Sequence, residues 1–274
     1  MTYAAVLVQV QATPQGVATL RCARDLAVRF EASLIGVGVQ AVPPPPFSDP
    51  SSLAGDWVVV MRESVENGLK AAQAMFAEAG ANLAKPTLWE SGMQLPGPAI
   101  ARAARGADLI VAAKPPKGHD DPFSTVRPGD LAIEAGRPVL IAPVDAPPLE
   151  AKRIVLAWKD TREARRAMSD AMPFFKRAEQ VLVLEVCSAD QEADAKIRTA
   201  DVVAALTRHG VSASARVVVH EPADAHQILR HASMFSADLI VAGAYGHSRL
   251  GELVFGGVTH DLLEQADRYV LLSH

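Results

Sequence analysis

The sequence predicts an α/β fold in which two doubly wound, mostly parallel five-stranded sheets follow one another in tandem along the chain. One observation behind this prediction is an internal repeat: the pentapeptide DLIVA at 108–112 recurs letter for letter at 238–242. Another is that short apolar runs alternate with segments of helical periodicity. Near-continuous apolar strands separated by helices are typical of parallel sheets that helices cover on both faces.

Two further matches extend the repeat in the same order. Residues 6–10 parallel 154–158 upstream of the pentapeptides, and residues 136–141 parallel 267–272 downstream of them. Three ordered matches indicate that the chain contains two copies of one domain.

The two copies meet at a segment with three prolines, 142–150, which is typical of a short, stiff and extended connector. We therefore expect domains at 1–146 and 151–274. The offset between the copies is larger upstream than downstream, so the first copy must carry an insertion. The proline run 43–46 opens that insertion, which extends to about Asp56. A stiff loop is favoured there over a polyproline ligand, because one short run is weak evidence for binding.

The second copy allows its elements to be assigned in order. Asp160 and Glu163 have the spacing of an N-cap and the N3 residue of a capping box, just before a stripe of apolar residues at helical spacing. Gly210 is expected to end a long helix. The expected strands are 153–158, 181–186, 215–219, 239–242 and 269–273, and the expected helices are 164–172, 189–209, 223–235 and one from about 258.

Composition and charge argue against several classes of protein. The formal net charge is −4, so the basic excess that marks a nucleic-acid binder is missing. No uncharged apolar run reaches the roughly 20 residues of a membrane-spanning helix, and the first residues do not resemble a secretory signal. Cys22 and Cys187 lie far apart among apolar neighbours and are expected to be buried thiols. We expect a cytoplasmic protein that binds neither nucleic acid nor membranes.

Glycines collect after the strand at 239–242, where a doubly wound sheet binds its ligands. Gly243 and Gly246 allow the chain to turn and to approach a ligand without a Cβ in the way. Gly256 and Gly257 precede the last helix, whose first N–H groups can bind an anion. The other candidate donors in this segment are the N–H of Val258, the hydroxyls of Ser248 and Thr259, and the guanidinium of Arg249.

The spacing Gly243-x2-Gly246-x9-Gly256, followed by a small residue, resembles the nucleotide-binding signature of ATP-binding universal stress proteins. The resemblance covers the whole chain as two copies, and the ending at 270–274 is also similar. It implies a universal-stress-protein-like fold of the adenine nucleotide alpha hydrolase type, and a site for ATP with an accompanying Mg²⁺ in the second domain. The residues that it implies for this site are Ala157, Lys159, Val186, Ala242, Gly243, Gly246, Ser248, Arg249, Gly256, Gly257, Val258 and Thr259.

Two positions in the second copy depart from the family's pattern. Gly257 stands where the family usually has Ser or Thr, and Lys159 aligns best with the acidic residue that ATP-binding members carry after the first strand. The first copy departs further, because Pro115 and Pro116 replace turn glycines and remove N–H donors. Gln11 stands there at the acidic position. A nucleotide site is therefore expected in the second domain only.

Two hypotheses of different classes stay open. The first is a stress-response protein that binds ATP or a related nucleotide, and the second is an interaction module that binds no nucleotide and acts through a protein partner not yet identified. The sequence lacks the Walker, GxSxG, HExxH and CxxC motifs, so no catalytic or metal-ligating residue is predicted, and at most weak ATP hydrolysis is expected.

The resemblance also bears on how the two copies associate. Universal stress proteins commonly pair through their last strand, and the two copies here could do so internally, with 138–142 against 269–273. One chain would then be a pseudo-symmetric dimer, and two chains could associate further as a homodimer.

Overall fold

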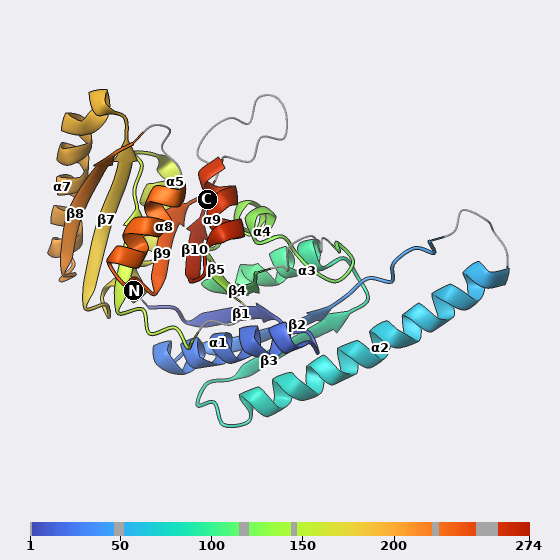
Figure 1. Ribbon diagram of the computed structural model, residues 1–274. Coiled ribbons are helices and arrows are strands. Elements are labelled where there is room, and N and C mark those ends of the chain that lie inside the picture. The colour runs from blue at the N-terminus through green and yellow to red at the C-terminus, as the bar shows by residue number, and fades with distance from the viewer. Residues whose placement is uncertain (1, 47–51, 115–120, 144–146, 221–224, 245–256) are drawn as a thin grey trace. The chain divides into compact units, whose positions relative to one another are not determined.

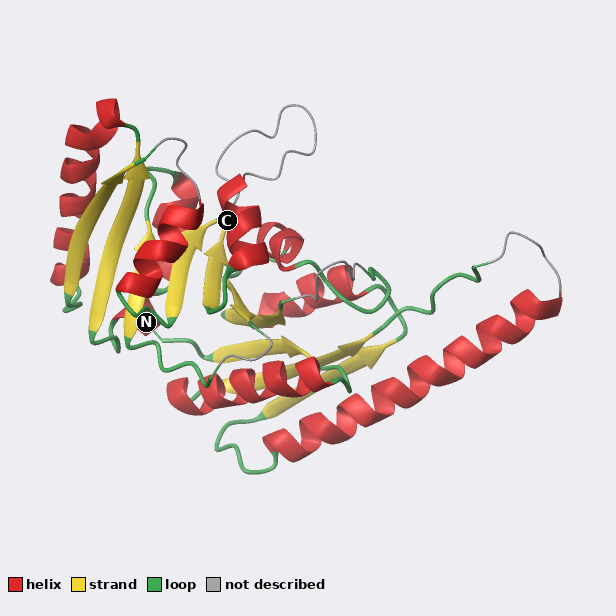
Figure 2. Ribbon diagram, viewed as in Figure 1, coloured by secondary structure: helices red, strands yellow, loops and turns green. Residues whose placement is uncertain are grey.

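The computed structural model describes residues 2–46, 52–114, 121–143, 147–220, 225–244 and 257–274, with side chains from residue 55 in the second of these ranges (Figure 1). The chain divides into two compact units, one of Tyr3–Ala135 and one that holds Gly136–His274. Both units are α/β with mostly parallel strands, which confirms the predicted fold class (Figure 2).

The first unit is a parallel sheet with strand order β3-β2-β1-β4. Helices α1 and α2 contact each other, and α3 contacts β2 and α4. The elements of this unit, in chain order, are β1 (Ala5–Gln9), α1 (Pro14–Phe30), β2 (Ser33–Val39), α2 (Ser52–Gly80), β3 (Thr87–Gly92), α3 (Pro96–Ala103), a 3₁₀ turn (Ala104–Gly106), β4 (Leu109–Ala113) and α4 (Pro128–Glu134).

The second unit has strand order β5-β10-β9-β6-β7-β8. All neighbours in this order are parallel except β5 and β10, which are antiparallel. Its elements are β5 (Val139–Ala142), β6 (Arg153–Ala157), α5 (Arg162–Asp170), α6 (Met172–Phe175), β7 (Gln180–Cys187), a 3₁₀ turn (Ala189–Gln191), α7 (Glu192–Arg208), β8 (Ala213–Val219), α8 (Ala225–Met234), β9 (Leu239–Gly243), α9 (Gly257–Gln265) and β10 (Tyr269–Ser273).

Strand β5 belongs to the first sequence repeat but clusters with the second unit. The reason is its register with β10, in which Ile141 faces Val270 and Val139 faces Leu272. The family resemblance predicts contact between these two segments, and the register shows it.

The first residue of the repeated pentapeptide, an aspartate, has the same structural role in both copies. The Asp108 carboxylate accepts hydrogen bonds from the backbone N–H groups of Ala4 (2.8 Å) and Ala5 (3.1 Å), at the start of β1. Asp238 does the same for Lys152 (3.0 Å) and Arg153 (3.3 Å), at the start of β6. In both copies the aspartate therefore satisfies donors at the beginning of the central strand, and the apolar residues that follow form a buried strand beside it.

The inner strands of both units are buried, as the near-continuous apolar runs predict. Figure 1 shows α7 lying along β7 and β8, and these are the strands that α7 contacts. Cys22 and Cys187 are both buried thiols that form no disulfide, and their burial is as expected. Among the described residues no helix is both long and apolar enough to cross a membrane.

Candidate functional site

The candidate site lies at the carboxyl edge of β6, β7 and β9. The chain leaves β6 towards β7 on one side, while β9 pairs with β6 on the other side, so this edge is a topological switch point. Ligands of doubly wound sheets bind in the crevice outside such a point. Ala157 ends β6 and pairs with Ala242, which lies one residue before the end of β9. Val186 lies near the end of β7. Ala157 and Val186 are half-buried, whereas Ala242 is buried.

Gly243 lets the end of β9 approach helix α5 closely. A Cβ at this position would lie 2.6 Å from the backbone nitrogen of Ala164 and 2.7 Å from the backbone carbon of Glu163. Backbone atoms cannot move aside as a flexible side chain can, so only glycine fits without displacing the helix. The sequence analysis gave Gly243 a role in approach to a ligand, and the described structure adds a packing role.

The predicted N-cap of helix α5 is wrong by one residue. Thr161, not Asp160, is the N-cap, and its hydroxyl accepts a hydrogen bond from the N–H of Ala164 at 3.3 Å. Glu163 therefore lies one position earlier in the helix than a capping box requires. Both residues can cap a helix, and the N–H of Thr161 donating to the carbonyl of Lys159 (2.7 Å) fixes a tight turn that selects the later residue.

Asp160 therefore does not cap helix α5. Its carboxylate forms an exposed ion pair with Arg165 on the first turns of α5. Lys159, which aligns with the acidic position of the resembling family, is exposed. An acidic side chain that does not cap the helix is thus present next to that position.

Glu163 is a buried carboxylate close to Gly243. Its side chain is paired with Arg162, with a closest distance of 3.0 Å. Burial opposes ionisation of Glu163, but its own backbone N–H and the Arg162 guanidinium outweigh burial and lower the pKa of this carboxyl below its ordinary value. The first turn of α5 therefore carries a stabilised negative charge, which suits the positive end of the helix dipole.

Trp158 is buried and is held by its backbone N–H, which donates to the carbonyl of Leu184 at 2.8 Å. Its indole Nε1–H is buried and has no hydrogen-bond partner in the part of the chain that the structure describes. A buried N–H without a partner next to Ala157 is a donor that a ligand at this edge could use.

Helix α9 begins at Gly257, between the parallel strands β9 and β10, so its N-terminus lies at the same carboxyl edge. Gly257 is exposed with open space around a would-be Cβ, Val258 is half-buried, and Thr259 is buried. The remaining predicted residues of the signature, Gly246, Ser248, Arg249 and Gly256, lie outside the described residues.

Two residues that the sequence analysis did not select lie beside the end of β9. The N–H of Ala244 donates to the carbonyl of Ser273 (2.8 Å), and the ring Nδ1 of His274 is 2.9 Å from the carbonyl oxygen of Ala244. Ser273 is buried, and its hydroxyl has no hydrogen-bond partner among the described residues. No motif pointed to them, because β10 meets β9 through the sheet register and not through the sequence.

The described residues contain no group of three or more His, Cys, Asp and Glu side chains that could hold a metal ion. What this edge offers instead is backbone N–H groups, a helix N-terminus and half-buried apolar residues. Such an arrangement can bind an anionic group together with a flat apolar group.

Comparisons with known proteins show which family the second half of the chain resembles. Residues 150–274 match the family model described as "Universal stress protein family". A search of curated proteins found no match.

Of three solved structures, two resemble the whole chain in fold, and the third covers less than half of it. A universal stress protein from Archaeoglobus fulgidus DSM 4304 is 15% identical, with 98% of this chain and 95% of that chain covered and a TM-score of 0.71. A protein of unknown function from Pseudomonas aeruginosa PAO1 is 17% identical, with 99% and 92% covered and a TM-score of 0.58. A universal stress protein from Archaeoglobus fulgidus in complex with dAMP is 18% identical, with 45% of this chain and 98% of that chain covered and a TM-score of 0.37.

Residues 150–274 are similar to the universal stress protein family. Over nearly its whole length the chain shares its fold with the two solved structures that cover it.

Proposed function

We propose that this protein binds ATP or a related adenine nucleotide in its second domain, 151–274, and acts as a stress-response protein. The observation that carries the proposal is the start of α9 at Gly257, at the carboxyl edge of β9 and directly after the glycine-spaced segment. Backbone N–H groups at a helix N-terminus bind phosphate without any charged side chain.

The base would lie over the ends of β6 and β7. Ala157 and Val186 supply half-buried apolar surface there, while the Trp158 indole N–H and the Asp160 carboxylate supply polar groups that can read a base edge. The phosphates would extend towards Gly257 and Val258, accompanied by Mg²⁺ that the nucleotide brings with it. The residues outside the described ranges that would complete this half of the site are Gly246, Ser248, Arg249 and Gly256.

In this proposal the protein is a binding protein and not an enzyme. No nucleophile with an adjacent base is assembled among the described residues at this edge, and slow hydrolysis of ATP is the most that the proposal allows. Nucleotide binding would instead change the surface that a protein partner contacts. The pairing of β5 with β10 supports a further part of the proposal, in which the two repeats associate through their last strands as an intramolecular pseudo-dimer.

The alternative proposal is an interaction module without a nucleotide. Gly257 and Lys159 favour it, because each departs from the pattern of ATP-binding members. The protein partner would then bind irrespective of ATP.

A thermal-shift experiment separates the two proposals. A ligand that binds only the folded protein stabilises it by about 2.7 kcal/mol at a concentration 100-fold above its Kd. ATP with Mg²⁺ is therefore expected to raise Tm in a saturable way, and a Gly246→Val variant that keeps its circular dichroism spectrum is expected to lose the effect. No rise in Tm at millimolar ATP would contradict the nucleotide proposal and would favour the interaction module.

A further inference from the structure

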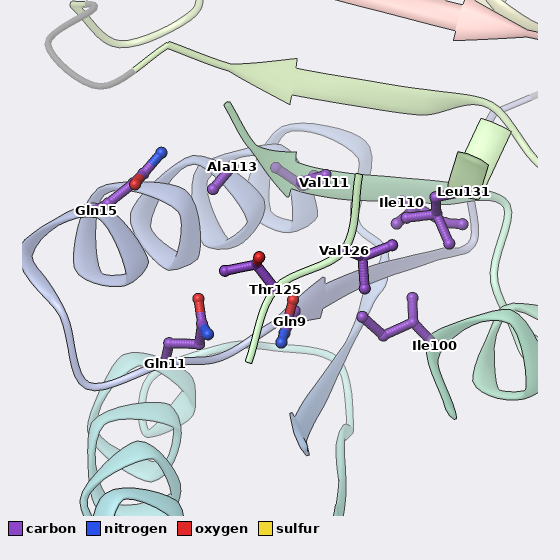
Figure 3. Close-up of a pocket in the computed structure, with 11 residues that line it drawn as sticks. Gln9, Gln11, Gln15, Ile100, Ile110, Val111, Ala113, Thr125, Val126 and Leu131 are labelled. Atoms are coloured by element: carbon purple, nitrogen blue, oxygen red, sulfur yellow. The ribbon is translucent and has the colours of Figure 1, made fainter. Parts of the chain in front are cut away.

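The first unit has a small pocket at the carboxyl ends of its strands. The candidate site of the second unit lies at the corresponding edge of its own strands. The pocket has a volume of about 40 Å³ and lies where β1 and β4 end, between helices α1, α3 and α4 (Figure 3). A cavity of this size has room for no more than a few water molecules. Apolar residues such as Ile110 and Leu131 line one side, and the side chains of Gln9, Gln11 and Gln15 line another.

A short segment of the chain fills the space beside this pocket. Gln9 and Gln11 each donate a hydrogen bond from Nε2 to the carbonyl oxygen of Ser124, at 2.8 and 2.6 Å. The N–H of Ala41, just after β2, donates to the carbonyl of Phe123 at 2.7 Å. Figure 3 shows Thr125 beside Gln9 at the pocket. We call the segment Asp121–Thr125 the strap.

The strap is held in shape by its own first residue. The Asp121 carboxylate accepts hydrogen bonds from the N–H of Phe123 (3.0 Å) and the hydroxyl of Ser124 (2.5 Å). The Asp121 carbonyl accepts from the N–H and the hydroxyl of Thr125, both at 2.9 Å. The strap is thus a closed turn that presents two carbonyl oxygens, those of Phe123 and Ser124, to the strand ends.

The strap engages the same positions that the proposed nucleotide site uses in the second unit. Strand register makes Gln9 equivalent to Ala157, and two residues on, Gln11 is equivalent to Lys159. By the same register Val39 corresponds to Val186, and Gln9 Nε2 also lies 3.4 Å from the Val39 carbonyl. The three predicted ligand positions at the ends of β6 and β7 are Ala157, Lys159 and Val186. Each therefore has a counterpart in the first unit that contacts the strap or one of the two glutamines bound to it.

We propose that the strap is an intramolecular ligand of the first unit, which occupies the strand-end site with two backbone carbonyls. A glutamine clamp, Gln9 and Gln11, holds the carbonyl of Ser124, and the N–H of Ala41 holds that of Phe123. Glutamine suits this task because its amide donates to a carbonyl, whereas a carboxylate at the same place would repel one. The clamp makes the first unit a closed module that holds no nucleotide. The identification of the positions rests on the proposed function of the second unit, but the clamp itself does not.

Hydrogen exchange of the full chain, without any nucleotide, tests the clamp. The reporter is the N–H of Ala41, which donates to the strap. A peptide that spans residues 40–46 narrows this signal to the N–H groups of Ala41 and Val42 beyond its first residue, because the four prolines at 43–46 carry no N–H. In a Gln9→Glu/Gln11→Glu variant we expect exchange at Ala41 to become at least about tenfold faster, since two hydrogen bonds are replaced by repulsion.

Two further variants make the result decisive. Asp121→Ala opens the strap from its own side without changing the strand ends, and we expect the same acceleration at Ala41. Gln73→Ala changes an exposed glutamine on α2 and should leave Ala41 unchanged. Peptides from α1 and β4 report whether the unit stays folded; where the double variant loses their protection, the single Gln11→Glu variant replaces it.

Unchanged exchange at Ala41 in both the clamp variant and Asp121→Ala would overturn the proposal. Because no ATP is present, this outcome is distinct from a failure of nucleotide binding in the second unit. A second readout adds ATP and Mg²⁺ to the wild-type protein, where exchange in the strap and at Ala41 is expected to stay the same. Slower exchange there on addition of ATP would show that the first unit binds nucleotide and would equally overturn the proposal.

Discussion

Glycines at the carboxyl edge of the second unit differ in what surrounds them. Gly243 is packed against the backbone of α5, whereas Gly257 faces open space at the start of α9. Glycine therefore has two different roles here. At Gly243 it allows close packing, and at Gly257 it leaves the helix N-terminus accessible.

Gly243→Ala is expected to destabilise the second unit. Its new methyl group would meet backbone atoms of Glu163 and Ala164, and overpacking of this kind costs about 1–3 kcal/mol. Thermal unfolding should show a lower Tm for this variant. Gly257→Ala is the matched control in the same unit and should leave Tm nearly unchanged; an equal loss in both variants would contradict the packing role of Gly243.

Gly257→Ser is expected to tighten nucleotide binding several-fold. The substitution adds a hydroxyl donor in open space at the N-terminus of α9, where the resembling family usually has Ser or Thr. Titration with ATP and Mg²⁺ gives the Kd of each variant. Gly257→Ala adds the Cβ without the hydroxyl, so tightening by Ala as much as by Ser would argue against a phosphate contact here.

At the scale of elements, polar side-chain contacts join helices to strands beside an inner core of apolar, buried strands. One such contact joins helix α8 to strand β8, where Arg216 Nη1 lies 3.3 Å from His231 Nδ1. Burial, followed by the charges of Arg216 and Arg230, lowers the pKa of His231 below its ordinary value.

This lowered pKa predicts a pH dependence of stability. As pH falls below about 6.5, His231 takes up a proton in the unfolded chain before it does so in the folded protein, so the free energy of unfolding decreases. The stabilisation is complete above that pH and is lost as pH falls through the folded pKa. His231→Gln should flatten the dependence of Tm on pH between about 5 and 7. A variant that keeps the full wild-type slope would contradict this role of His231.

The sequence predicted most elements because their signals are local. The repeat and the apolar runs identified the inner strands, and the spacing of the two copies indicated an insertion from 43 to about 56. The prediction of a loop over all of that insertion is wrong, because its end from Ser52 onwards is the start of helix α2. The cap of α5 was misassigned because Asp160 and Thr161 are both good N-caps, and only the turn at Lys159 decides between them. That turn depends on backbone geometry, which a residue pattern does not encode.

The parts of the site that the sequence could not predict arise from contacts between distant segments. Ser273 and His274 reach Ala244 through the pairing of β10 with β9, and Ser124 reaches Gln9 across 115 positions of the chain. The close contact of Gly243 with α5 likewise depends on how helix and strand pack. By contrast, the glycine spacing after β9 is contiguous in the chain and was visible at once.

At the scale of the whole molecule, the two repeats share a fold but differ at their strand ends. In the first unit glutamines hold the chain's own strap at that edge, and in the second unit Ala157, Lys159 and Val186 occupy the equivalent positions. The account therefore assigns nucleotide binding to one half of the chain, with the other half as a closed module of the same fold.

The central claim is one nucleotide site per chain, in the second domain. Calorimetric titration of ligand-stripped protein with ATP and Mg²⁺, beside the Gly246→Val variant, tests it most directly. The account predicts saturable binding with a stoichiometry near one per chain that the variant abolishes. A stoichiometry near two, binding that survives in Gly246→Val, or no heat at millimolar ATP would contradict it.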